Sequence, residues 1–176
     1  MFDKLIDFIL NQIKNIIPFV IIFQFQNGVR YTFGRKSKVL KPGIHLKVPY
    51  IQTVLSDNVV DTTMVLPAQS VITSDGKQLI VKGAVGFSIE NIEDFYNKVY
   101  DTRSAISDKT CIIIRNTISV NDFETCITDV SGINDILTED IQEEVAQYGI
   151  KINFVALIDL TESPSFRLFN ETIQLG

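Results

Sequence analysis

Few side chains in this sequence have catalytic potential, and the single histidine, His45, is the first to consider. A Ser-His-Asp or Cys-His mechanism would have to be built around it. His45 stands between Ile44 and Leu46 in an alternating stretch, so we expect its ring to point away from the apolar face of a strand. A structural or surface role is therefore predicted for His45, and no catalytic residue is assigned.

Metal-binding and nucleophilic side chains also lack the spacing of a site. Cys111 and Cys126 have no metal-ligand pattern, and we predict free thiols, with a disulfide between them as the alternative. The HExxH, P-loop, GxGxxG and GxSxG motifs are missing from the sequence. One run of carboxylates falls on the polar side of a helical pattern and is predicted to be solvated charge: Glu139, Asp140, Glu143 and Glu144. We expect no enzymatic activity, no cofactor and no metal.

Composition indicates a globular chain whose charge disfavours nucleic acid. Hydrophobic residues make up 45% and charged residues 21% of 176 positions, and the formal net charge is −5. An acidic chain does not attract a polyanion, so no nucleic-acid partner is expected. One basic concentration is either a contact for lipid phosphates or an ordinary charged loop: Arg35, Lys36, Lys38 and Lys41.

The first 18 residues have the pattern of an amphipathic helix. Charged and amide side chains within this stretch, and Pro18 inside its longest apolar run, argue against a membrane-spanning helix. Two alternatives remain for its apolar face: it lies on a membrane surface, or it packs on the chain's own core or on a neighbouring subunit. The residues predicted to bind the membrane are Phe2, Leu5, Ile6, Ile9, Ile13, Ile16 and Ile17, together with Phe19.

After Pro18 the pattern changes to antiparallel strands. Asn27-Gly28 predicts a hairpin between strands at residues 19–26 and 29–33. Alternation at residues 44–48 predicts a strand that buries one face, which carries Ile44, Leu46 and Val48. Further strands are expected up to residue 90, with a hairpin turn at Asp75-Gly76 and a bend or bulge at Gly83 and Gly86.

Residues 91–149 have helical periodicity, and residues 150–160 alternate again. Helices are predicted at residues 92–101, 104–119, 120–127 and 132–149, with Asn91 as the first N-cap and Gly149 at C′ of the last. Strands, then helices, then a closing strand indicate an α+β fold. We divide the chain into an N-terminal helix (1–18), a folded domain (19–160) and a C-terminal tail (161–176). A stripe on the last helix suggests a surface for like neighbours, and hence a homo-oligomer: Ile133, Ile136, Leu137 and Ile141.

The stretch VRYTFGRKSKVLKPGIHLKVPYIQTV, with the later VITSDGKQLIVKGAVGFSIEN, resembles the SPFH or band 7 family of stomatins, prohibitins and flotillins. PGIH followed by VP, and the TSDG hairpin, are its most specific pieces, and the likeness covers about residues 19–160. The resemblance implies a non-enzymatic, membrane-associated scaffold that self-assembles. Its implied partners are membrane lipids, further copies of itself, and membrane proteins or a membrane protease.

The sequence departs from the usual family pattern in two places. No stretch of it has the pattern expected of a transmembrane anchor, and after Asp159 it has no sustained heptad pattern of the usual coiled coil. We therefore expect a short family member, peripheral on the cytoplasmic side of a membrane. The alternative is a soluble cytoplasmic structural protein that forms a closed homo-oligomer with the N-terminal helix buried between subunits.

Overall fold

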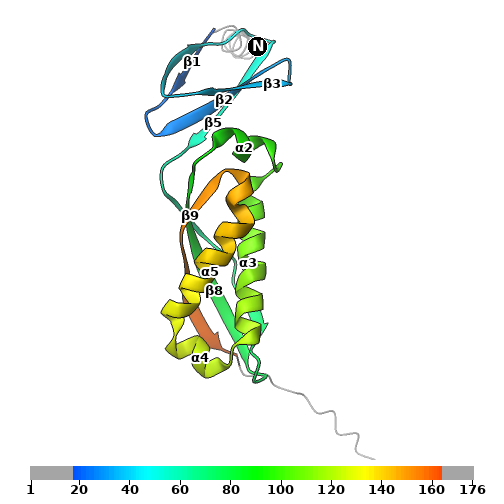
Figure 1. Cartoon of the computed structure of the whole chain (residues 1–176), viewed down its shortest axis with the longest axis vertical. Coiled ribbons are helices and arrows are strands. Elements are labelled where there is room, and N and C mark those ends of the chain that lie inside the picture. Colours follow the sequence, from blue (N-terminus) through cyan, green and yellow to red (C-terminus); the bar gives the residue numbers. More distant parts are fainter. Residues whose placement is uncertain (1–17, 164–176) are drawn as a thin grey trace, which may run out of the picture.

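The computed structural model describes residues 18–163, so the predicted N-terminal helix and most of the predicted tail lie outside the described residues. The described residues form two modules stacked end to end (Figure 1). We call residues 18–58 the β module and residues 59–163 the helical module. The element order confirms the predicted α+β fold, with antiparallel strands first, then helices, then a closing strand.

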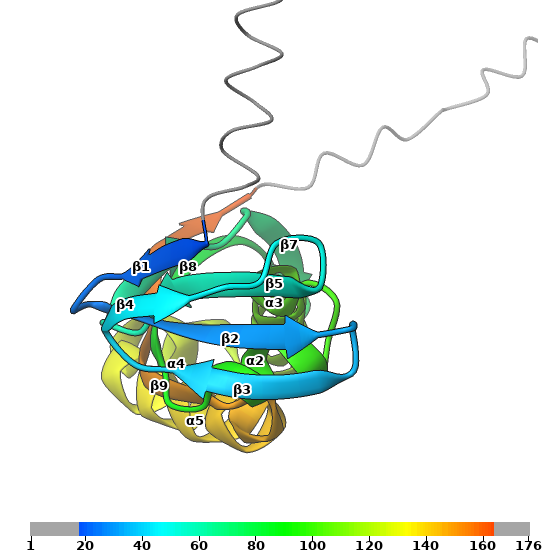
Figure 2. The ribbon, with the colours of Figure 1, turned by 90° about the horizontal axis from the view of Figure 1, so that it is seen from above.

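The β module contains five short strands in two layers: β1 (Phe19–Ile22), β2 (Gln26–Thr32), β3 (Lys36–Leu40), β4 (Gly43–Leu46) and β5 (Gln52–Asn58). Strands β1 and β4 pair into a two-stranded ribbon, and β2 lies between β3 and β5 in a three-stranded sheet. Figure 2 looks onto this end of the molecule, with the helices behind it.

The predicted hairpin turn at Asn27-Gly28 is wrong, because both residues lie inside β2. The chain reverses earlier, where the Gln26 N–H donates to the carbonyl of Phe23 at 2.9 Å. Gly28 is required for a different reason: a Cβ there would come within 3.0 Å of Ile22 Cδ1 and 3.1 Å of the Leu55 carbonyl oxygen. The glycine therefore lets the ribbon approach the sheet instead of forming a turn.

The helical module places four helices on one face of a second antiparallel sheet. Its strands are β6 (Thr62–Val65), β7 (Gln69–Ile72), β8 (Gln78–Ile89) and β9 (Ile150–Glu162). Its helices are α2 (Ile92–Asn97), α3 (Thr102–Val120), α4 (Phe123–Thr128) and α5 (Val130–Val145), followed by a 3-10 turn, η1 (Ala146–Tyr148). Strand β8 pairs with β9 along one edge and with β6 and β7 along the other.

Several local predictions for this module are confirmed. Gly76 has φ 83° in the turn between β7 and β8, and the β8–β9 register shifts at Gly83 and after Gly86. The Asn91 side chain accepts from the first-turn amides of α2, and Gly149 takes the left-handed conformation with φ 70°. The residues at the turns and helix ends of the helical module therefore determine its turns and caps as expected.

The core lies between the β8–β9 pair and the inner faces of α3 and α5. Ile133, Leu137 and Ile141 of α5 are fully covered there, whereas Ile136 is half exposed. Most of the stripe predicted to meet like neighbours thus packs on the chain's own sheet, and the predicted oligomer surface on this helix is wrong. The reason is that the helix has a sheet to cover, so its apolar stripe is satisfied within one chain.

Helix α5 also covers the free edge of β9 with polar side chains. Asn134 Oδ1, Thr138 Oγ1 and Gln142 Oε1 accept from the backbone N–H groups of β9. The donors are Leu157 at 3.0 Å, Val155 at 2.9 Å and Ile152 at 2.7 Å. A strand edge of this length would otherwise be a template for pairing with another chain. The three side chains close it from Ile152 to Leu157.

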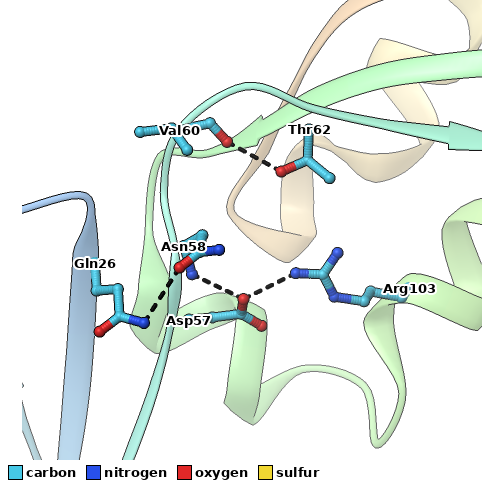
Figure 3. Close-up of polar contacts among 6 residues, drawn as sticks. All are labelled: Gln26, Asp57, Asn58, Val60, Thr62 and Arg103. Atoms are coloured by element: carbon cyan, nitrogen blue, oxygen red, sulfur yellow. Dashed lines mark hydrogen bonds and ion pairs between the residues drawn. The ribbon is translucent and has the colours of Figure 1, made fainter. Parts of the chain in front are cut away.

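Polar contacts fix the two modules to each other. Asp57 at the end of β5 pairs with Arg103 of α3 at 2.8 Å (Figure 3). Tyr31 Oη of the β module also donates to Asn97 Oδ1 of the helical module at 2.7 Å. Next to the ion pair, Gln26 Nε2 donates to Asn58 Oδ1 at 3.2 Å within the β module (Figure 3). Val29 of β2 belongs to the same core cluster as the helices, so apolar packing is continuous across the junction.

Candidate functional site

The histidine and the two cysteines, the residues with catalytic potential, do not form a common site in the described structure. The His45 ring is half-buried, and its Nε2 lies 2.7 Å from the carbonyl oxygen of Lys41. Both thiols are free, which confirms that prediction, and burial raises the pKa of Cys111 and of Cys126. Among residues 18–163, no group of three or more histidine, cysteine or carboxylate side chains is arranged to hold a metal.

The carboxylates of α5 lie on its outer side. Asp140, Glu143 and Glu144 line an open groove against α3, and Glu144 forms an ion pair with Lys109. This is solvated helix charge, as predicted from the sequence.

An exposed apolar face on the β1–β4 ribbon is the most unusual surface in the described part of the chain. Phe19 is opposite Leu46 in the register, and Ile21 is opposite Ile44. These four side chains are between 55% and 72% exposed, whereas Ile22, the residue after Ile21, is 2% exposed. We call these four residues the ribbon face. A contiguous, uncovered apolar patch of this kind marks a surface that meets a partner or a lipid.

The alternation at residues 44–48 was predicted to bury Ile44, Leu46 and Val48, and this prediction is wrong. All three are exposed, and His45 points toward the module instead. Period-two alternation shows that a strand has two different faces, but it does not say which face has a layer to cover it. The ribbon has one covering layer, on the side of Ile22.

Contacts with the sheet below hold the ribbon in place. Arg30 on β2 reaches across and donates from Nη1 to the carbonyl of Leu46 at 3.1 Å. The Lys47 N–H donates to the carbonyl of Pro18 at 2.6 Å, which fixes the point where the chain enters β1. At the other end of the ribbon, the rings of Phe23 and Phe25 stack with centroids 5.7 Å apart, and both are about half exposed. The apolar surface therefore extends beyond the four residues of the ribbon face.

Charge is strongly segregated between the two modules. Residues 18–58 contain one acidic residue, Asp57, and six basic residues: Arg30, Arg35, Lys36, Lys38, Lys41 and Lys47. Residues 59–163 contain seven basic and seventeen acidic residues. Because Asp57 is paired with Arg103, the β module presents a basic surface on a chain whose overall charge is −5. Such a module is attracted to an anionic surface, and the helical module is repelled by one.

The structure describes one of the eight residues predicted to bind a membrane. Phe19 lies on the ribbon face, and the others, Phe2, Leu5, Ile6, Ile9, Ile13, Ile16 and Ile17, lie outside the described residues. Sequence reasoning missed Ile21, Ile44 and Leu46, because it assigned the apolar alternation to a core. It also missed the basic β module, which a charge count over each half of the sequence reveals.

The fold agrees with the comparisons to known proteins. Residues 20–168 match the model of the SPFH domain / Band 7 family, and the chain belongs to that family. This confirms the family resemblance predicted from the PGIH and TSDG stretches. Members of the family are generally membrane-associated scaffolds and generally not enzymes.

Curated relatives match most of this chain at low identity. An uncharacterized protein of Methanocaldococcus jannaschii is 24% identical over 141 residues, covering 80% of this chain and 71% of the relative. A putative band 7 family protein of Acanthamoeba polyphaga mimivirus is 23% identical over 81% of this chain and 47% of its own length. Protein HflC of Buchnera aphidicola is 28% identical over 80% of this chain and 45% of its own length. The chain thus spans about half the length of the latter two relatives.

The described residues contain no helix that is both long and apolar enough to span a bilayer.

Proposed function

We propose that this protein is a non-enzymatic peripheral scaffold of the band 7 type, which rests on a membrane through its β module. The ribbon face carries the proposal: four cross-strand-paired apolar side chains are exposed on the module whose basic residues outnumber its acidic residues by six to one. Family membership supports a membrane-associated scaffold in general. Residues 2–17, for which the sequence predicts an apolar helix face, precede β1 closely in the sequence, and we propose that they extend the same contact.

The expected strength of the contact follows from area and charge. Burying one Ile or Leu side chain fully is worth about 1.5–3 kcal/mol, and the four side chains of the ribbon face are each more than half exposed. Their insertion is therefore worth about 4–7 kcal/mol before ordering costs. Each basic residue near an anionic lipid surface adds about 1 kcal/mol at physiological salt. Together these contributions support reversible binding.

Self-association and the organisation of membrane proteins are part of the proposal. The general scaffold role of the family supports this part of the proposal. In the alternative, a closed homo-oligomer would cover the ribbon face and the N-terminal helix without lipid.

Vesicle flotation with matched variants tests the proposal. Ile21→Asp combined with Ile44→Asp places charge on the ribbon face, and Ile72→Asp combined with Ile158→Asp makes the same change at equally exposed sites of the helical module. On phosphatidylcholine–phosphatidylserine vesicles, the first pair should lower partitioning at least about thirtyfold, since two Ile contributions are lost, and the second pair should not.

Molar mass by light scattering is measured in parallel. Suppose that wild-type protein does not bind vesicles and that the Ile21→Asp, Ile44→Asp variant has a lower molar mass than wild type. These results would refute the membrane scaffold and favour the closed soluble oligomer. Equal loss of flotation in both double variants would show that the ribbon face is not the contact.

A further inference from the structure

Phe33 and Tyr50 are large aromatic residues at exposed turn positions where the backbone disfavours them. Phe33 has φ 54° and Tyr50 has φ 65°, and they are the only non-glycine residues with positive φ in the described chain. Their side chains are 76% and 84% exposed, so packing does not offset the strained conformation. Exposed strain of this kind is characteristic of functional contacts, because stability alone would favour Gly or Asn at such turns.

A direct backbone contact brings the two turns together. The Phe33 N–H donates to the carbonyl of Ile51 at 3.0 Å, and Thr32 is opposite Gln52 in the β2–β5 register. Phe33 begins the turn between β2 and β3, and Tyr50 lies in the segment that links β4 to β5. Both aromatic side chains therefore lie at the same end of the three-stranded sheet.

The same end of the module adjoins the ribbon and the point where the N-terminal segment enters. The linking segment begins at Lys47, whose N–H donates to the carbonyl of Pro18, and it follows Leu46 of the ribbon face directly. Val48 and Ile51 in this segment are also partly exposed. An apolar rim thus runs from Phe19 and Leu46 to the two aromatic side chains.

Charge at this rim favours an anionic lipid surface and disfavours contact with the same basic rim of a second copy. Residues 18–56 contain no acidic residue, and the module's single carboxylate, Asp57, lies at the opposite end of β5. Arg35 follows Phe33 by two residues, and Lys47 precedes Tyr50 by three. Aromatic rings next to cations are the side chains that bind at the boundary between headgroups and acyl chains.

We propose, on the basis of the membrane role proposed above, that Phe33 and Tyr50 insert together into the headgroup–acyl boundary of an anionic bilayer. They determine which edge of the β module faces the membrane, and the helical module projects away from it. The occupant of this rim is lipid, not a second copy of the chain.

The chain contains no tryptophan, so single substitutions provide site-specific probes of depth. Phe33→Trp and Tyr50→Trp are compared with Tyr100→Trp, a fully exposed position of the helical module before α3. The variants are bound to phosphatidylcholine–phosphatidylserine vesicles with brominated acyl chains. The tryptophan emission of the first two variants should shift to the blue and be quenched by the bromine atoms. The emission of the Tyr100→Trp variant should neither shift nor be quenched. If all three variants float with the vesicles yet remain unquenched, the inference fails while the membrane role stands.

A second variant separates insertion from a folding role. Combining Phe33→Gly with Tyr50→Gly removes both rings and relieves both positive-φ positions, so the melting temperature should be unchanged or higher. Vesicle affinity should nevertheless fall about tenfold, as expected when two interfacial aromatic anchors are lost. Unchanged affinity would contradict the inference. Emission from either Trp probe that shifts with protein concentration without vesicles would also contradict it, since it would mean that a second copy covers the rim.

Discussion

Thr138 provides a sharp test of how α5 closes the edge of β9. Its Oγ1 accepts from the Val155 N–H at 2.9 Å and donates to the Asn134 carbonyl at 2.7 Å. Val155 is 1% exposed, so water cannot replace the lost acceptor in a Thr138→Val variant. A buried, unsatisfied N–H costs about 1–3 kcal/mol, and the added methyl group recovers less than about 1 kcal/mol.

The net loss of about 1–2 kcal/mol should lower the melting temperature by about 2–8 °C for a chain of this size. Thr128→Val is the matched control, because Thr128 Oγ1 also donates to the carbonyl four residues earlier but the residue is exposed to water. Thermal unfolding followed by circular dichroism measures both. If the two variants melt within about 1 °C of each other, the hydrogen bond from Val155 to Thr138 contributes nothing and the reasoning is refuted.

Two further predictions concern pH. Burial, with the nearby Asp57 carboxylate, raises the pKa of Tyr96 from 10.0 to about 12. The protonated phenol is thus favoured in the folded state, so stability should fall as pH rises from 10 to 12. Tyr96→Phe should weaken this dependence in urea titrations, and the rest should persist because burial also raises the pKa of Tyr31. Hydrogen bonds from Ser104 and Thr125 lower the pKa of the N-cap carboxylates Asp101 and Asp122 below 3.8. The two carboxylates therefore add to the free energy of unfolding above pH 3.8, and this contribution is lost as pH falls through their folded-state pKa values. In a protein with both Asp101→Asn and Asp122→Asn, stability should therefore fall less steeply as the pH is lowered. An unchanged dependence of stability on acid pH would contradict this.

Local chemistry in the helical module was sufficient to predict its turns, caps and strand irregularities. Asn91 caps α2, Gly76 takes the turn, and Gly83 and Gly86 interrupt the β8–β9 register as expected. Each of these depends on a residue and its immediate neighbours. The family resemblance, which rested on short stretches such as PGIH, was also correct.

The errors arose where a side chain's role depends on a distant segment. Gly28 is a close-approach glycine because Ile22 lies against it, not because Asn27 precedes it. Ile44 and Leu46 are exposed because the ribbon has a layer on only one side, and Ile136 is exposed because the β8–β9 sheet covers only part of the α5 stripe. In the same way, the spacing of Asn134, Thr138 and Gln142 places them on one side of a helix in the sequence. The sequence does not show that the edge of β9 lies against that side and donates hydrogen bonds to them.

Hydrogen exchange of the whole chain, with and without phosphatidylcholine–phosphatidylserine vesicles, tests the central claim most directly. We expect vesicles to slow exchange in the β1–β4 ribbon, in residues 33–35 and in residues 47–51, while α3, α5 and β9 exchange at unchanged rates. This pattern would place the β module on the membrane and the helical module away from it. Protection confined to the helical module, or no change anywhere in the chain, would contradict the account.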